Sequence, residues 1–532
     1  MRSLVRHVSP LALALGLSAC ADNAAVSAET ESETGTQPAD TESGAGTSGS
    51  SATTMGGTAG GTTSGKTETE TSNADASTTT DDASTSDDTG GSTGEPVEVP
   101  VGASGAWRYD VQLSFFMYDM AAHPDGGVVV AGMVDTTDGN NRDAVIAHVA
   151  DDGTVQWSLR KDAVPNEQFF SVVVAGETVY GVGLSRRDVG QGNTNQVLIS
   201  EFDLDGSYAG SVLFGSPTSD EHAYEAVALS NGGLAISGYT DQTGFGDRDG
   251  LLMVLDEALA LQWAVGVGGA FEDSLFSLTE DDDGGLLGVG LLRNSAEVSG
   301  NLVTKYDTSG SPVFTFEFGN GGFNIMRGIA PLDGGRYLIV GQTSDWGAGG
   351  MDGYFGVLEP QGDPVVSLST LGGAQFEALR ELIPLGDDRF AVAGQAGSVS
   401  MTEDAWLLRL DTSDVPTVDF NVVYDSPRNQ RMVFGVGAAR ADGGLSVGLH
   451  DVDESNDMTN EPVILHTDSL GGLDQACPTQ AADAFAAVPV EDIVTPGTTV
   501  SQGSVNFSRT TASATDEPFV AFDWGTQAAL CE

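Results

Sequence analysis

Short apolar segments alternate with glycine-rich turns from residue 105 to about residue 472. Many of these segments follow a turn such as Asp-Gly-Gly, and along each of them apolar and polar positions alternate with a period of two. Each segment closes on a glycine, and these closing glycines recur every 51–55 residues at Gly132, Gly183, Gly238, Gly290, Gly341, Gly394 and Gly448. Because no stretch of comparable length shows a helical period, this region is predicted to be all-β.

Each repeat contains enough alternating segments for four strands. The closing glycine is followed by a polar loop and another alternating segment. A tight turn then leads to a last segment that often carries an aromatic residue, such as Trp157, Trp263 or Phe314. Seven repeats of four strands predict a seven-bladed β-propeller. An open array of seven repeats is the alternative.

The two ends of the repeat region favour a closed ring. The seventh repeat has a third strand at residues 461–471 but no convincing fourth strand after it. An isolated segment at residues 105–111 precedes the first repeat and aligns with the fourth strands at residues 155–159 and 261–265. We expect this N-terminal segment to be the outer strand of blade seven, which would close the ring and hide its open edges.

These turns and strands resemble the seven-bladed propeller repeats of exported bacterial proteins, known as SBBP repeats, and the related delta-60 repeats. The resemblance covers residues 105 to about 472. It implies a propeller domain over residues 104–472 and specifies architecture far better than function.

The first twenty residues have the features of an export signal. Arg2 and Arg6 precede an apolar run at residues 10–19 that is too short to span a bilayer. The following Leu17-Ser18-Ala19-Cys20 resembles the lipobox of bacterial lipoproteins. The resemblance implies that residues 1–19 are removed and that Cys20 carries acyl chains such as palmitate. The protein would then be anchored in the bacterial cell envelope, at the outer membrane; the alternative is an ordinary cleaved signal peptide with a chance cysteine.

Residues 20–103 are predicted to form a lipidated cysteine and a disordered tether. Between residues 21 and 97, 43 of 77 residues are Ser, Thr or Gly, and Ile, Leu, Phe, Trp and Tyr do not occur. Such a segment cannot bury apolar surface. As a flexible coil it would reach about 50 Å.

The formal net charge of −56 limits the partners of the chain. Nucleic acids and anionic lipid surfaces attract cationic proteins, so neither is expected to bind here. An acidic surface of this kind favours cations, basic proteins or neutral polymers such as glycans.

Residues 473–532 are predicted to form a short C-terminal β extension, with strands near residues 491–494, 498–508 and 518–523. Cys477 and Cys531 bracket it, and a disulfide is the simplest expectation for two leftover cysteines in an exported protein. Metal ligation by these two cysteines is the alternative.

Aligning the innermost strands by their turns places small or acidic residues around the mouth of the central channel. The positions are Asp119, Ser171, Glu225, Ser277, Gly328, Glu381 and Gly435, and the residues before them are Tyr118, Phe170, Tyr224, Phe276, Arg327, Arg380 and Phe434. One interpretation is that only small or solvated side chains fit near the axis. The alternative is that Asp119, Glu225 and Glu381 form a ligand site or hold a hard cation such as Ca²⁺.

Other motifs add little chemistry. Aspartate-rich turns, such as residues 281–284, 203–206 and 451–453, lack the glutamate that completes a Ca²⁺ loop, and Asx turns explain them. His148 and His466 occupy equivalent places in third strands and are expected to be structural. The sequence contains no HExxH pair, P-loop or dinucleotide fingerprint. No cofactor is firmly implied, although Ca²⁺ remains a candidate.

The longer loops fall on one face of the predicted ring, and this long-loop face is the expected binding surface. We therefore expect a monomeric, non-enzymatic binding or scaffold module for a protein or glycan. The alternative is a propeller enzyme that acts on polysaccharide or another envelope polymer, with channel carboxylates as acid and base. A third alternative is a purely structural envelope protein.

Overall fold

The computed structural model divides the chain into two compact units, residues 1–97 and 98–532. The structure describes residues 104–532 except for 112, 137–141, 162–165, 189–192, 217, 297, 360–364, 398–402, 426–429, 432–436, 454–458, 474–478, 483–485, 491–500, 506–507, 513–518, 525 and 530–532. Cys20, Cys477 and Cys531 therefore lie outside the described residues. Among those that are described, no helix is long and apolar enough to cross a membrane.

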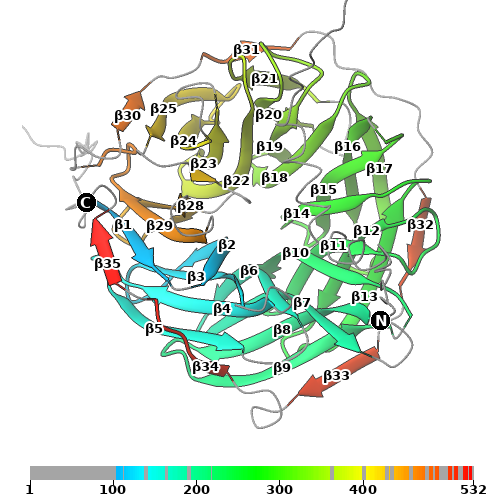
Figure 1. Ribbon diagram of the computed structural model, residues 1–532. Coiled ribbons are helices and arrows are strands. Elements are labelled where there is room, and N and C mark those ends of the chain that lie inside the picture. Colours follow the sequence, from blue (N-terminus) through cyan, green and yellow to red (C-terminus); the bar gives the residue numbers. More distant parts are fainter. Residues whose placement is uncertain are drawn as a thin grey trace, which may run out of the picture. The chain divides into compact units, whose positions relative to one another are not determined.

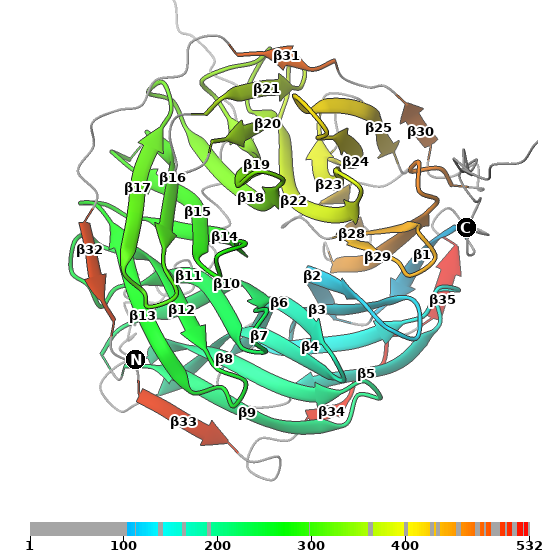
Figure 2. The same ribbon diagram turned by 180° about the vertical axis from the view of Figure 1, so that it is seen from behind.

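Seven antiparallel sheets stand around a central axis as the blades of a β-propeller (Figures 1 and 2). Blade one contains β2 (Ser114–Ala122), β3 (Val128–Asp135), β4 (Arg142–Val149) and β5 (Val155–Lys161). Blade two contains β6 (Glu167–Ala175), β7 (Thr178–Asp188), β8 (Asn193–Asp203) and β9 (Tyr208–Gly215). Blade three contains β10 (Glu221–Ala228), β11 (Leu234–Thr240), β12 (Asp249–Leu255) and β13 (Leu261–Gly268).

The remaining blades repeat this order from the axis outward. Blade four contains β14 (Ser274–Glu280), β15 (Leu286–Arg293), β16 (Ser299–Tyr306) and β17 (Pro312–Phe318). Blade five contains β18 (Asn324–Leu332), β19 (Arg336–Thr343), β20 (Asp352–Leu358) and β21 (Ser367–Leu371). Blade six contains β22 (Glu377–Gly386), β23 (Arg389–Ala396), β24 (Asp404–Asp411) and β25 (Thr417–Asp425).

Blade seven joins the two ends of the propeller sequence. Its inner strands are β26 (Gln430–Arg431), β27 (Gly437–Ala439), β28 (Leu445–Asp453) and β29 (Thr459–Thr467), and β1 (Gly105–Asp110) pairs with β29. Trp107 of β1 lies opposite Ile464, so β1 is the fourth strand of this blade. The prediction of a closed seven-bladed ring is therefore confirmed.

Aromatic residues of the outer strands cover the turns of the next blade. The indole Nε1 of Trp157 donates a hydrogen bond to the carbonyl of Leu204 (2.9 Å), and the ring lies over Gly206. Gly206 has a φ of +84°, so glycine suits both the turn and the close ring. Trp263 makes the equivalent bond to Thr308. Their shared spacing in the sequence thus reflects one repeated contact between blades.

The core lies between the blades. Because both faces of an inner strand pack against a neighbouring sheet, all residues of β11, β12 and β20 are buried. One such layer joins Val182 and Ile199 of blade two to Ile236 and Met253 of blade three. Apolar burial of this extent supplies most of the stabilising free energy of folding.

The predicted C-terminal β extension wraps around the rim of the propeller. It contributes the six short strands β30 (Thr479–Ala482), β31 (Val488–Pro489), β32 (Ser501–Ser504), β33 (Ser508–Ala512), β34 (Phe519–Ala521) and β35 (Thr526–Ala529), the C-terminal belt. They pair in turn with the outer strands of blades six, five, three, two, one and seven. Figure 1 shows them as orange and red arrows around the ring. Within the described residues, blade four is the four-stranded sheet that the belt leaves uncovered.

Aromatic side chains, one buried and one half-buried, fix the belt to the ring. Trp524 packs edge-on against Tyr109 with ring centroids 5.1 Å apart and also contacts Phe115. Phe519 lies among Phe169, Phe202 and Tyr208 of blade two. The belt thus covers strand edges that would otherwise be open to pairing with other chains.

Candidate functional site

A β-bulge in the innermost strand of the first six blades shapes the wall of the channel. In blade one, the register between β2 and β3 shifts between Met117 and Asp119, so that Tyr118 is the extra residue. The same shift recurs in blades two to six at Phe170, Tyr224, Phe276, Arg327 and Arg380. Since a bulge redirects side chains, residues at the bulge and after it, such as Tyr118 and Asp119, can both line the channel.

The structure corrects one position of the predicted ring. In the first six blades, the residue after the bulge pairs with the residue before the closing glycine, and in blade seven Gly437 holds this place opposite Val447. The sequence alignment had placed Gly435 there, two residues too early, and Gly435 lies outside the described residues. Glu225 has four residues of β10 before it and three after it, so it lies near the middle of the innermost strand.

Asp119, Glu225 and Glu381 bind the backbone of the following blade. The hydroxyl of Ser171 and the N–H of Val172 donate hydrogen bonds to Oδ2 of Asp119, at 2.9 Å and 2.8 Å. Ser277 and the N–H of Leu278 donate to Glu225 in the same way. The N–H of Gly437 donates to Glu381 (2.8 Å). These three side chains therefore link neighbouring blades as well as lining the cavity.

Burial strongly raises the pKa of these carboxyl groups. It raises the pKa of Asp119 to about 7 against three hydrogen bonds that lower it. It raises the pKa of Glu225 to about 8, and the charge of Asp119 adds to the shift. The pKa of Glu381 lies well above its ordinary value because of burial first and the charges of Asp119 and Glu225 second. At neutral pH this ring thus carries fewer negative charges than the sequence suggests.

These shifts predict that the propeller loses stability as the pH rises from about 4.5 to about 8. In that range the unfolded chain has released the protons of Asp119 and Glu225 while the folded chain still holds them, so the free energy of unfolding falls with pH. Thermal unfolding should show a higher midpoint at pH 5 than at pH 8. Asp119→Asn and Glu225→Gln should each flatten this dependence, and Asp205→Asn in an exposed turn should not. A midpoint that rises from pH 5 to pH 8 would contradict the assignment.

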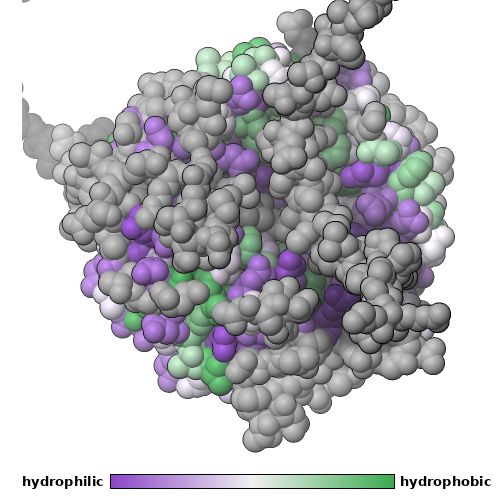
Figure 3. All heavy atoms as spheres, in the orientation of Figure 1, coloured by the Kyte–Doolittle hydropathy of each residue, from purple (hydrophilic) through white to green (hydrophobic). Residues whose placement is uncertain are grey.

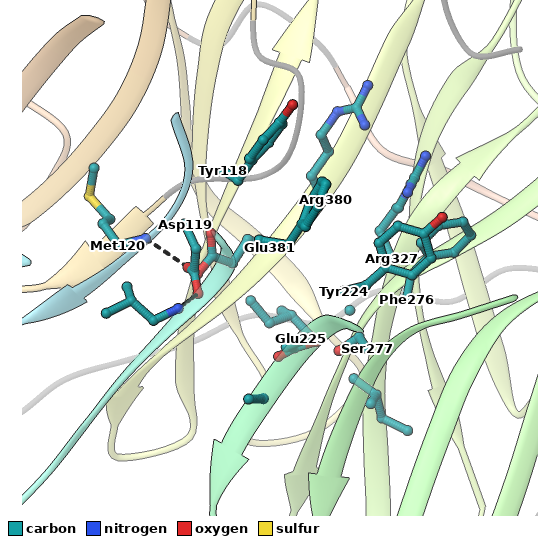
Figure 4. Close-up of a pocket in the computed structure, with 16 residues that line it drawn as sticks. Tyr118, Asp119, Met120, Tyr224, Glu225, Phe276, Ser277, Arg327, Arg380 and Glu381 are labelled. Atoms are coloured by element: carbon teal, nitrogen blue, oxygen red, sulfur yellow. Dashed lines mark hydrogen bonds between the residues drawn. The ribbon is translucent and has the colours of Figure 1, made fainter. Parts of the chain in front are cut away.

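The carboxyl groups share the channel with an arc of four aromatic side chains and with two arginines. The aromatic arc is Tyr118, Phe170, Tyr224 and Phe276, and the arginines are Arg327 and Arg380. Tyr118 stacks on Phe170 with ring centroids 4.5 Å apart, and Tyr224 lies 4.8 Å from Phe276. The guanidinium of Arg327 covers the ring of Phe276 at 4.2 Å. Figure 4 shows Arg327 and Arg380 extending together from neighbouring strands, with the carboxyl groups of Asp119 and Glu225 on the other side of the view.

These groups enclose a cavity of about 220 Å³, here called the channel pocket. It is lined by the aromatic arc, the two arginines and the carboxyl groups of Asp119, Glu225 and Glu381. Other lining residues include Met120, Val172, Ala226, Gly328, Ile329 and Leu382. Tyr224, Phe276 and the three carboxyl side chains are partly exposed, so solvent reaches the pocket. The described residues on the face drawn in Figure 3 mix hydrophilic and apolar side chains.

The described residues offer no clear metal centre. No group of three or more His, Cys, Asp or Glu side chains within them is placed to hold a metal ion. The aspartate-rich turns make the expected local bonds: Asp281 accepts from the N–H groups of Asp283 and Gly285, and Asp205 accepts from that of Ser207. Asp451 pairs with Arg108 (3.5 Å). The Ca²⁺ prediction for Asp119, Glu225 and Glu381 therefore stays a prediction without structural support.

Two groups with catalytic potential are built into the sheets. Residues 444–448 have the Gly-x-Ser-x-Gly spacing of a hydrolase nucleophile, but Ser446 is fully buried within β28 and not at an exposed strand-to-helix turn. His148 stacks on His123 with ring centroids 3.7 Å apart and contacts the carbonyl of Gly126 (2.8 Å). Neither arrangement presents a nucleophile and base to solvent.

No protein-family model matches the sequence, and the search of curated proteins found no relative. Solved structures show likeness in fold. A phage phi92 endosialidase is 10% identical, with 70% of each chain covered and a TM-score of 0.40. Sqt1 from Chaetomium thermophilum is 13% identical, with 71% of this chain and 88% of that chain covered and a TM-score of 0.39. The β-propeller domain of the Trilobed protease from Pyrococcus furiosus is 8% identical over 69% and 98%, with a TM-score of 0.36. Similarity at this level says nothing of what the chain binds or does.

Proposed function

We propose that the chain is a lipid-anchored protein of the bacterial cell envelope whose propeller is a non-enzymatic binding module for a protein or glycan. The observation that carries this proposal is the channel pocket, where the buried Arg327 and Arg380 share a solvent-accessible cavity with an arc of four aromatic side chains. Aromatic faces and a few convergent polar groups are the usual composition of a ligand site.

The N-terminal sequence supports the anchoring part of the proposal. Cys20 at the end of the lipobox would carry the acyl chains, and several buried acyl chains give stable attachment to a membrane. Residues 21–97 would separate the propeller from the outer membrane by about 50 Å. This distance suits a module that reaches a ligand beyond the surface of the bilayer.

The bonding of the carboxyl groups favours binding over hydrolysis. A general acid and base must be free to exchange protons with a substrate. Asp119, Glu225 and Glu381 instead accept hydrogen bonds from the following blade. A propeller enzyme with these residues as acid and base is therefore the weaker candidate.

The proposal can be tested with the full chain in detergent micelles on an array of envelope glycans and proteins, with and without Ca²⁺. We expect the chain to capture a ligand that it does not cleave. Tyr224→Ala, which removes a partly exposed ring of the channel pocket, should weaken capture about tenfold or more, because aromatic side chains supply much of the contact energy in such sites.

The matched control is Tyr180→Ala. Tyr180 is a half-buried tyrosine near the tight turn between β6 and β7, away from the long loops, and its replacement should leave capture unchanged. Cleavage of a captured polymer, seen as new chain ends, would favour the enzyme. Equal capture by both variants would contradict the assignment of the pocket.

A further inference from the structure

The two arginines of the channel pocket are buried without enough partners. Arg327 is 9% exposed and Arg380 is 4% exposed. Nε and Nη2 of Arg380 donate to Oε1 of Gln395, at 3.1 Å and 2.8 Å. Nη1 of Arg380 and Nε of Arg327 are buried and have no hydrogen-bond partner among the described residues.

Burying these two guanidinium groups costs folding free energy when no ligand is bound. Burial lowers the pKa of Arg327 to about 9, and the nearby charge of Arg380 lowers it further. Buried charges are normally paired, because the desolvation of an unpaired ion is costly. The charge of Glu403 offsets part of this cost for Arg380. The stacking of Arg327 on Phe276 offsets only part of this cost. An anion placed between the two guanidinium groups would supply the negative charge that this pair lacks.

The other residues of the pocket indicate which class of molecule would bear the anionic group. Tyr224 and Phe276 present rings on which a flat or chair-shaped ring can pack, and the carboxyl groups of Asp119, Glu225 and Glu381 offer polar contacts below them. Each of these carboxyl groups accepts hydrogen bonds from the next blade and keeps further lone pairs, to which the hydroxyl groups of a sugar can donate and a purely aromatic acid cannot. The volume of about 220 Å³ is below the roughly 300–1,000 Å³ of sites for drug-sized ligands, which leaves room for one ring.

We propose that the channel pocket binds a sugar acid, with its carboxylate held between Arg327 and Arg380 and its ring packed against Tyr224 and Phe276. The planar guanidinium groups suit a carboxylate because each can donate two parallel hydrogen bonds. The sugar acid is either free or the terminal residue of an acidic glycan. This inference rests on the binding function proposed above and specifies its ligand.

The test is a calorimetric titration of the full chain with glucuronate and galacturonate, and with glucose and galactose as uncharged counterparts. We expect binding of a sugar acid at least about tenfold tighter than that of its neutral counterpart, since a hydrogen bond to a charged group is roughly twice as strong as one between neutral groups. A uronate-terminated oligosaccharide that binds more tightly than the free acid would identify a glycan as the source. Benzoate should bind more weakly than either acid.

The variants separate the pocket from general charge effects. Arg327→Gln and Arg380→Gln should each weaken binding of the acid about tenfold or more. Arg409→Gln is the control, because Arg409 stacks on Phe420 in the same manner (5.2 Å) but lies on the outer part of blade six. If either pocket variant fails to fold, the wild-type chain decides: the acid, but not its neutral counterpart, should raise the midpoint of thermal unfolding.

The outcomes distinguish this inference from the proposed function. Equal binding of acid and neutral sugar, or binding that survives both arginine replacements, would overturn the sugar-acid assignment. The array could detect a ligand whose capture depends on Tyr224 while no sugar acid binds. That result would support the binding function and contradict the sugar-acid assignment. If the chain binds neither sugar acids nor any array ligand, both proposals fail.

Discussion

Replacing Cys477 or Cys531 by serine is expected to lower the free energy of unfolding by about 4 kcal/mol. A bond between the two cysteines would close a loop of 55 residues, and the chain-entropy model assigns that much stabilisation to a loop of this size. Both cysteines lie outside the described residues, so the disulfide is a prediction from the sequence. Chemical denaturation of the two single variants and the double variant measures the effect.

The path of the C-terminal belt supports this prediction. Cys477 precedes β30 by two residues, and Cys531 follows β35 by two residues. The belt begins on blade six and, after passing around the ring, ends on blade seven. These blades are neighbours, and β30 and β35 lie on the same side of the ring in both views (Figures 1 and 2). A disulfide here would close the belt around the propeller.

The double variant should be no less stable than either single variant, because each removes the same bond. Cys20→Ser is the control and should leave the unfolding of the propeller unchanged. Thiol titration of the denatured, unreduced chain provides an independent check. Two reactive thiols from Cys477 and Cys531 would contradict the disulfide.

Gly238→Ala is expected to destabilise the propeller by about 4 kcal/mol or more, or to prevent folding. Gly238 closes the repeat in β11, opposite the bulge of β10, and an added Cβ would overlap the carbonyl oxygen of His222. Backbone cannot move aside as a flexible side chain can, so the strand pair would have to separate. The equivalent glycines Gly132, Gly183, Gly290, Gly341 and Gly394 meet a carbonyl in the same way.

Gly269→Ala is the matched control. Its Cβ would have Leu292 as its nearest neighbour at 3.7 Å, an ordinary contact, and the change should cost less than about 1 kcal/mol. Thermal unfolding of the two variants measures the difference. An unchanged midpoint for Gly238→Ala would show that the bulge does not fix the closing glycine.

The repeat could be predicted from the sequence because one physical requirement recurs in it. In the first six blades, the bulge brings a carbonyl against the second strand, and only glycine fits there. The closing glycines therefore mark the blades, and the unpaired segment with Trp107 predicted the closure of blade seven. The bulge itself left no residue signal, which is why blade seven was aligned two residues too early.

The C-terminal belt could not be predicted as such. Its strands are two to five residues long and contain few apolar residues, as in Thr479–Ala482 and Thr526–Ala529. Strands of this length have no readable period, and their pairing depends on edges that the propeller supplies. Phe519 and Trp524 are the signals that could have been used, since both are large apolar residues in a polar segment.

For the channel pocket, the ring of carboxyl groups can be predicted from the sequence, but the role of the two arginines cannot. The alignment of the innermost strands predicts that Asp119, Glu225 and Glu381 share the channel, and the structure adds that each also accepts a hydrogen bond from the next blade. Arg327 and Arg380 stood in the neighbouring position without an assigned role. Their burial and their open donors depend on packing between blades, which no local pattern reveals.

The most direct test of the channel pocket as the binding site is a crystal structure of the chain grown with saturating glucuronate. We predict electron density for the sugar in the channel, with its carboxylate within hydrogen-bond distance of Arg327 and Arg380. Density for the sugar elsewhere on the propeller, with the channel pocket filled by water alone, would contradict the assignment.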